Sequence, residues 1–277
     1  MTSPPDRRNL HCHEMSPQRS GARPARRILW VHGYTLNASI WDHLWSLLPD
    51  HHHFAFDLPG HGTARALVPG DTTRTLAEHV LSVARAVQAT DLAGLSFGGT
   101  ISLEAACLAP DLFETVILAA PGLVGGPEDP EAATCNQDLI SMARERGVGP
   151  WLVDRWMTVP PQIFAGIETK SKLWNQLRDV ALAHDWGVLQ TGIMAGMFTH
   201  AQSAKRIGRI QSKISLLSGD HDMPSFLRCT ELVRRANRNA SKHNIAGGHH
   251  LCLLANSAEC AAIINRVLQN EVANGVL

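Results

Sequence analysis

The chain has 277 residues, of which 44% are apolar, and its 25 Lys and Arg residues balance 25 Asp and Glu residues. A chain of this length and apolar content can bury a sizeable core without the help of a disulfide or a structural metal. The neutral charge balance offers no electrostatic footprint for a nucleic acid or an anionic membrane. We therefore expect a small-molecule partner, and neither a nucleic-acid nor a membrane partner.

The six cysteines are scattered along the chain and form no CxxC pair. Several lie within apolar runs, which is typical of reduced thiols in a protein core. No run of the sequence is long enough to cross a bilayer, and the first residues contain no apolar signal-peptide segment. These features favour a cytoplasmic location, while the role of the Arg-rich N-terminal tail and the oligomeric state stay open.

Apolar runs and amphipathic segments alternate through the first part of the chain. Residues 28–31 are a continuous apolar run, which is typical of a strand buried on both faces, and residues 115–122 are predicted as another strand. Between them, residues 39–48 and 75–87 carry apolar side chains at helical spacing, behind the predicted capping pairs Ser39 with Asp42 and Thr75 with Glu78. This alternation predicts an α/β fold with a mostly parallel sheet flanked by helices on both faces.

The alternation stops at about residue 124 and resumes with a strand pattern at residues 213–220. The segment between is helical in pattern, and we interpret it as a cap inserted between two core strands. Four segments are therefore predicted: residues 1–27 as an N-terminal tail with a short edge strand at 10–15, residues 28–123 as the first part of the core, residues 124–208 as the helical cap, and residues 209–277 as the second part of the core.

Residues 94–98, GLSFG, match the GxSxG pattern between a predicted strand and a predicted helix. The pattern needs a sharp strand-to-helix turn that exposes a strained serine, and glycine neighbours leave room for that turn. The turn also places the Phe97 N–H at a helix N-terminus, where it faces any negative charge that develops on a substrate oxygen. Ser96 is therefore the candidate nucleophile.

Five motifs occur in an order that resembles the α/β-hydrolase fold superfamily: HG at 32–33, DLPGHG at 57–62, GLSFGG at 94–99, SGDHD at 218–222 and GGHH at 247–250. Within it the chain looks most like small carboxylesterases of the pimeloyl-carrier-protein methyl ester esterase kind and like the menaquinone-pathway synthase, which keeps the triad but catalyses an elimination. The resemblance implies Ser96 as nucleophile and an oxyanion hole formed by the backbone N–H groups of Tyr34 and Phe97. It also implies chemistry that needs no metal or other cofactor.

Two carboxylates compete for the acid of the triad, which follows the serine and precedes the histidine in this superfamily. Asp220 and Asp222 both follow the strand that ends near Gly219. The family's GxxD pattern selects Asp222, and a residue further into the turn reaches the next loop more easily. Asp220 is instead expected to cap the turn by accepting from nearby backbone N–H groups.

Two adjacent histidines compete for the base. His249 fits a literal GH pattern, whereas relatives carry the histidine about six residues before the N-cap of the last helix. Asn256 and Glu259 look like the capping box of that helix, and this spacing selects His250. Because adjacent side chains of an extended segment point to opposite sides, His249 would then face solvent or the cap. His249 stays the alternative.

Several other features have a structural or a functional interpretation. The three histidines at 51–53 are expected to form a solvated loop, since first-shell ligands need a converging set of further groups. The Tyr34 phenol is either a pocket wall, which we favour, or a hydrogen-bonding group for the substrate. Aromatic side chains in the cap predict a pocket for an apolar acyl or ring-bearing substrate. The candidate pocket residues are Trp151, Trp156, Trp174 and Trp186.

Three functions are compatible with these residues. The first is hydrolysis of a carboxylic ester, lactone or thioester through an acyl-Ser96 intermediate, with His250 as base and Asp222 orienting it. The second is a lyase or C–C bond hydrolase that uses the same triad without an acyl-enzyme. The third is a ligand-binding protein that keeps a vestigial triad, because a fold alone does not define a function.

Overall fold

A computed structural model describes residues 12–19, 24–127, 129–158 and 162–269. The strands of this part of the chain form one seven-stranded sheet with the order β1-β3-β2-β4-β5-β6-β7. β1 pairs antiparallel with β3, and every other pairing is parallel. The strands are β1 (His13–Met15), β2 (Arg27–Val31), β3 (His52–Ala55), β4 (Asp91–Leu95), β5 (Thr115–Ala119), β6 (Lys213–Gly219) and β7 (Ala240–Ile245).

The register of the sheet brings the carboxyl ends of its central strands to one edge. Val31 of β2 lies opposite Gly94 of β4, and Leu95 lies opposite Ala119 of β5. The strands β4 and β5 are buried along their whole length, as parallel strands covered on both faces must be. The loops that follow β2, β4, β6 and β7 therefore meet at this edge, where ligands bind in open α/β sheets.

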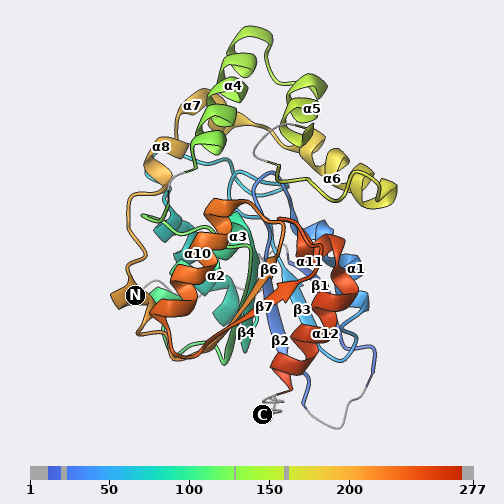
Figure 1. The fold of residues 1–277 in the computed structure, drawn as a ribbon, viewed down its shortest axis with the longest axis vertical. Helices are drawn as coiled ribbons and strands as arrows, with labels where there is room; N and C mark the ends of the chain where they lie inside the picture. Colours follow the sequence, from blue (N-terminus) through green and yellow to red (C-terminus); the bar gives the residue numbers. More distant parts are fainter. Residues whose placement is uncertain (1–11, 20–23, 128, 159–161, 270–277) are drawn as a thin grey trace.

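Helices cover both faces of the sheet (Figure 1). One face packs against the short helices η2, α1 and α11 and the final helix α12, and the other face packs against α2, α3, α9 and α10. These helices are η2 (Ala38–Trp41), α1 (Asp42–Ser46), α2 (Thr73–Ala86), α3 (Phe97–Leu108), α9 (Ala204–Ile207), α10 (Pro224–Ala236), α11 (Cys252–Ala255) and α12 (Ser257–Leu268). No helix among the described residues has the length and apolar character that a membrane crossing requires.

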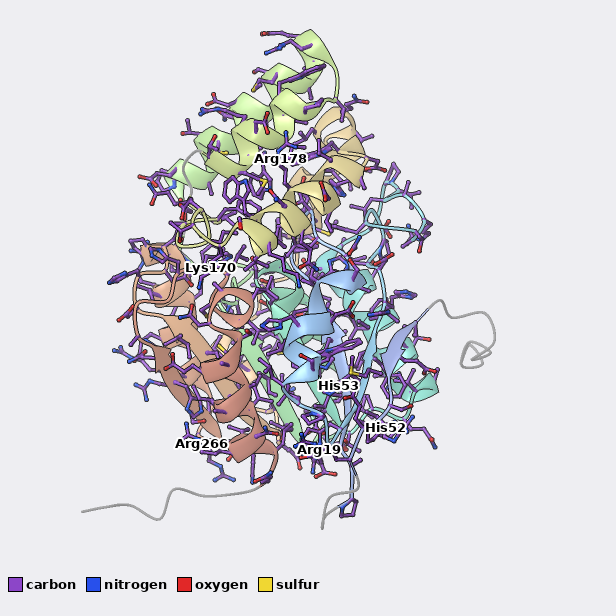
Figure 2. All side chains as sticks on the ribbon, turned by 90° about the vertical axis from the view of Figure 1, so that its right-hand side faces the viewer. Arg19, His52, His53, Lys170, Arg178 and Arg266 are labelled. Carbon is purple, nitrogen blue, oxygen red and sulfur yellow. The ribbon has the colours of Figure 1, made fainter. Side chains whose placement is uncertain are left out.

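The remaining helices form a cap over the carboxyl edge of the sheet, at the top of Figure 1. Figure 2 shows two residues of this cap, Lys170 and Arg178, above the core. Val124 and Gln202 join the two ends of the cap segment. The Val124 N–H donates to Gln202 Oε1 at 3.0 Å, and the Gln202 N–H donates to the Val124 carbonyl at 2.9 Å. The cap helices are α4 (Pro130–Arg146), α5 (Pro150–Thr158), α6 (Ser171–Ala183), α7 (Gly187–Thr191) and α8 (Met194–Met197).

The predicted edge strand is shorter than expected. β1 covers His13–Met15, while Leu10 and His11 lie outside the described residues. β1 adds to the sheet antiparallel to β3, with Glu14 opposite Phe54. β1 is thus an antiparallel edge strand on an otherwise parallel sheet, a common arrangement in mixed sheets.

Three predicted helix caps were wrong in detail. The first helical turn is capped by Asn37, whose side chain accepts from the Ser39 N–H, so Ser39 is already inside the turn. Thr72 caps α2 from an extended conformation, and Thr75 is its reciprocal partner in the box. Asn256 does precede α12, but its side chain makes no capping bond, because α11 ends directly before it and its backbone is not extended.

The histidines at 51–53 do not form a solvated loop, which corrects that expectation. His51 and His53 are buried, and His53 lies on β3 (Figure 2). The indole N–H of Trp30 donates to His53 Nδ1 at 3.1 Å, so His53 Nε2 carries the hydrogen and donates to the Leu48 carbonyl at 2.8 Å. Burial lowers the pKa of His53 to about 4. This imidazole is a neutral core group with both nitrogen atoms satisfied.

Candidate active site

Ser96 sits in a strained turn between β4 and α3, with φ of 55° and ψ of −118°. A side chain in this region of the backbone map is uncommon and costs free energy. The glycines of the motif make the turn possible: a Cβ at Gly94 would lie 2.5 Å from the carbonyl oxygen of Gly98, and a Cβ at Gly98 would lie 2.3 Å from those of Val31 and His32. The turn can form only where these two positions lack side chains.

Three side chains from three loops form a continuous hydrogen-bonded chain. His250 Nε2 lies 2.8 Å from Ser96 Oγ, and His250 Nδ1 lies 2.9 Å from Asp222 Oδ1. The side chains of His250 and Asp222 are fully buried. An imidazole between a hydroxyl and a carboxylate can accept the hydroxyl proton and be stabilised as the imidazolium. The structure thus brings together the serine, the acid and the base that the sequence predicted as candidates.

Asp222 lies in a turn that is closed by backbone groups. The Met223 N–H donates to Asp222 Oδ1 at 2.7 Å, while the Asp222 N–H donates to the Gly219 carbonyl at 3.2 Å. Asp220 does not show the expected capping role: the N–H groups of residues 220–222 donate to main-chain carbonyls, and the Met223 N–H donates to Asp222. Asp220 is exposed, and its carboxylate lies 3.9 Å from the ring of its neighbour His221.

His249 points away from Ser96 and toward the cap. Its ring packs against that of His221, with centroids 5.3 Å apart. It also lies against Gly166 of the cap, where an added Cβ would come within 2.4 Å of the His249 ring. Adjacent histidines thus face different partners, as expected for neighbouring side chains of an extended segment.

The turn after β2, residues 33–36, lies beside Ser96. The Leu36 N–H closes this turn on the Gly33 carbonyl at 3.2 Å. His32 fixes the same carbonyl: its Nε2 accepts from the Leu58 N–H at 3.0 Å, so its Nδ1 carries the hydrogen and donates to Gly33 O at 2.9 Å. Burial, together with the neighbouring His61, lowers the pKa of His32 to about 3. A neutral imidazole therefore holds the loop that carries Tyr34.

Two backbone N–H groups are candidates for the oxyanion hole, as the resemblance implied. Phe97 is the first residue of α3, and the first N–H groups of a helix have no partner within it. Tyr34 lies in the turn after β2, next to the cavity that also contains Ser96. Donors in these two places flank the nucleophile, an arrangement suited to stabilising a developing oxyanion.

The cavity at Ser96 is small, about 20 Å³, which is of the order needed to hold one water molecule. Core and cap both contribute to its wall. It is lined by Gly33, Tyr34, Leu36, Ser96, Trp156, Ile163, Phe164 and Leu251.

Of the four predicted pocket tryptophans, the structure brings Trp156 to this cavity. Trp186 is fully buried inside the cap and is not one of the lining residues, while Trp151 and Trp174 are partly buried further out in the cap. Tyr34 was also expected at the pocket wall, whereas Leu36, Ile163, Phe164 and Leu251 carry no motif that could have indicated them from the sequence.

An aromatic cluster around the Tyr34 ring joins the cap to the core. The rings of Trp156 and His184 lie at centroid distances of 5.7 Å from Tyr34, and Trp186 lies at 6.4 Å. The core contributes His61, at 5.8 Å. Burial raises the pKa of the Tyr34 phenol, which keeps that group protonated at neutral pH. Tyr34 thus lines the cavity and contacts three aromatic rings of the cap.

A row of three buried imidazoles runs behind Tyr34; His32 and His61 belong to the HG and DLPGHG motifs, whereas His184 carried no signal in the sequence. His61 lies between His32 and His184, with ring centroids 5.0 and 4.8 Å away. Burial lowers the pKa of His61 to about 4 and, helped by His61, that of His184 to about 3. These groups are neutral in the folded protein at neutral pH.

Comparison with known proteins defines the class. The model of the alpha/beta hydrolase family matches residues 28–263. One curated relative, the dihydrolipoyllysine-residue acetyltransferase component of the acetoin cleaving system of Pseudomonas putida, is 36% identical over 114 residues, which cover 38% of this chain and 29% of that protein. The chain spans about a third of the length of the curated relatives that it matches.

Two solved structures share the fold over almost their whole length. MenH from S. aureus has a TM-score of 0.78 and 17% identity, with 94% of this chain and 98% of that chain covered. The enol-lactonase from Burkholderia xenovorans LB400 has a TM-score of 0.76 and 20% identity, with coverage of 94% and 96%. The chain belongs to the alpha/beta hydrolase family.

Proposed function

We propose that this enzyme is a serine hydrolase that cleaves a carboxylic ester, lactone or thioester with a small, neutral, apolar acyl group. The observation that carries the proposal is the chain of hydrogen bonds from Ser96 Oγ through His250 to Asp222. The strained Ser96 backbone at the N-terminus of α3 supports it, because strain of this kind is retained where a nucleophile must be exposed.

Acylation uses the triad and the two N–H groups. His250 Nε2 takes the Ser96 Oγ proton while Oγ attacks the carbonyl carbon, and Asp222 stabilises the imidazolium through Nδ1. The negative charge on the former carbonyl oxygen is held by the N–H groups of Tyr34 and Phe97. Collapse of this intermediate breaks the bond to the leaving group, which takes the proton from His250 and departs as an alcohol or thiol.

Deacylation repeats the sequence with water. His250 takes a proton from a water molecule, whose oxygen attacks the acyl carbon bound to Ser96. The second tetrahedral intermediate expels Ser96 Oγ, which recovers its proton from His250, and the carboxylic acid leaves. One oxygen atom of the product acid therefore comes from water.

The cavity supports a small acyl group without charge. Its walls are formed by apolar and aromatic side chains, and no charged side chain is among the described residues that line it. A carboxylate-bearing acyl group would lose its hydration there without gaining a cationic partner, which costs several kcal/mol. A volume of about 20 Å³ leaves little room while the cap is closed on the core, so longer acyl chains must displace cap side chains such as Ile163.

The test is a panel of p-nitrophenyl esters with acyl chains from acetyl to octanoyl, assayed with wild type and Ser96→Ala. We expect kcat/KM to be highest for the shortest chains and to fall by at least about 10⁴-fold in Ser96→Ala. Hydrolysis in ¹⁸O-labelled water should put one label into the carboxylate. Turnover of a substrate without label in its product would instead support elimination, and unchanged activity in Ser96→Ala would contradict the mechanism.

Ser102, on the helix α3 that follows Ser96, provides a matched control for the Ser96→Ala variant. Ser102 is buried on α3, and its hydroxyl makes no hydrogen bond within the described part of the chain. Ser102→Ala therefore removes a buried hydroxyl near the site without affecting the triad, and we expect its kcat/KM to stay within about threefold of wild type.

A further inference from the structure

The turn that carries the Tyr34 N–H contains a second strained residue. Thr35 has φ of 60°, in the left-handed region that β-branched residues rarely adopt. Its side chain is fully buried. This strained conformation costs free energy, which the backbone would recover by relaxing. The turn therefore persists only if contacts with the surrounding structure hold it.

The cap supplies a hydrogen bond that holds this turn. The indole Nε1–H of Trp156, on α5, donates to Thr35 Oγ1 at 3.0 Å in a buried contact. The two residues are 121 positions apart in the sequence. The Trp156 ring also meets the Tyr34 ring nearly edge-on, with planes inclined by 84°. One cap side chain therefore contacts two successive residues of the oxyanion loop.

We propose that Trp156 is a positioning residue for the oxyanion hole: by holding the strained Thr35 turn, its indole N–H aims the Tyr34 backbone N–H at the substrate oxygen. This inference rests on the proposed serine-hydrolase function. Donors of an oxyanion hole act only when they are preorganised to within a few tenths of an ångström, and small displacements cost large factors in rate. Closure of the cap then completes the catalytic arrangement as well as covering the substrate.

Packing alone is the competing explanation, because Trp156 also fills space at the cavity wall. Trp186 separates the two explanations. It is buried in the same cluster around Tyr34, but its indole N–H donates to the Ala181 carbonyl of the cap at 3.0 Å. Trp186→Phe therefore removes a buried indole donor of the same cluster without removing a bond to the oxyanion loop.

The experiment compares Trp156→Phe, Thr35→Val and the double variant with wild type, using p-nitrophenyl acetate and an alkyl boronic acid as transition-state analogue. Each single variant should lower kcat about 10- to 100-fold with KM within threefold, and should raise the Ki of the boronic acid in parallel. The kcat of the double variant should lie within twofold of that of the less active single variant, because both substitutions remove the same hydrogen bond. Thr35→Ser keeps the hydroxyl and should restore kcat to within threefold of wild type.

Thermal unfolding of each variant distinguishes a loss of position from a loss of fold. Wild-type kcat in a folded Thr35→Val protein, additive losses in the double variant, or an equal loss of kcat in Trp186→Phe would overturn the inference. Ser96→Ala in the same assay tests the function on which it rests. If that variant keeps its activity, the proposed function is wrong; if Ser96 is essential but Thr35→Val has wild-type kcat, only the role of Trp156 is wrong.

Discussion

The ring of Phe226 lies against the imidazole of His250, with ring centroids 4.3 Å apart and planes inclined by 62°. Phe226 belongs to α10, which begins two residues after Asp222. One short segment therefore supplies both the carboxylate that binds His250 and an apolar surface that limits the rotation of its ring. The His250 imidazole, the proposed base, is held from two sides by Asp222 and Phe226, which lie close together in the sequence.

Replacing Phe226 with leucine should weaken this support without removing any polar group of the site. We expect kcat to fall about 3- to 10-fold with KM unchanged, because an aromatic pair of this kind contributes about 0.5–1.5 kcal/mol. Steady-state kinetics with p-nitrophenyl acetate would show it. An unchanged kcat, in a variant with the wild-type unfolding temperature, would mean that Asp222 alone positions the ring.

The adjacent histidines should differ sharply in their effect on turnover. His250→Ala removes the hydrogen-bond partner of Ser96 Oγ and should lower kcat by at least about 10⁴-fold. His249→Ala removes a ring that packs on His221 and the cap, and kcat should stay within about fivefold of wild type. The matched pair of variants is assayed with one ester at one pH. A larger loss of kcat in His249→Ala than in His250→Ala would instead identify His249 as the base.

The row of buried imidazoles His32, His61 and His184 predicts a loss of stability on mild acidification. In the unfolded chain they titrate near pH 6.5, whereas burial lowers the pKa of His61 to about 4 and those of His32 and His184 to about 3. The unfolded chain therefore binds protons first as the pH falls. The free energy of unfolding should be highest above about pH 6.5 and should decrease toward pH 4, by up to about 1.4 kcal/mol per pH unit for each group.

Urea unfolding at a series of pH values would measure this slope. His184→Asn offers the matched comparison, since it removes one of the three imidazoles while keeping a polar side chain beside Tyr34. The variant should show a shallower decline between pH 6.5 and 4 than wild type. Equal slopes would contradict the assignment of His184 as a buried neutral group.

Periodicity and motif order were sufficient to predict the architecture. Continuous apolar runs identified the central strands, because parallel strands covered on both faces carry few polar residues. GxSxG between a strand and a helix selected Ser96 as the candidate nucleophile, and the spacing to the N-cap of the last helix selected His250 as the candidate base. Both predictions depend on local spacing, which the sequence records directly.

Features that depend on tertiary contacts could not be predicted. His53 was expected in solvent, yet its ring is satisfied by Trp30 and Leu48, and such long-range partners leave no mark in a local pattern. Thr35 shows the same limit, since nothing in the residues around it indicates a left-handed backbone or a partner 121 residues away. The cap tryptophans were predicted as a group, and only the packing selects Trp156 for the cavity wall.

The most direct test of the central claim is covalent labelling with a fluorophosphonate, followed by intact-mass measurement and peptide mapping. If Ser96 is the nucleophile activated by His250, its Oγ displaces fluoride, and the protein gains the mass of one phosphonyl group on the peptide that contains Ser96, with loss of esterase activity. Ser96→Ala should stay unlabelled and His250→Ala should label far more slowly. Full esterase activity in a protein labelled at Ser96, or labelling confined to another residue, would contradict the account.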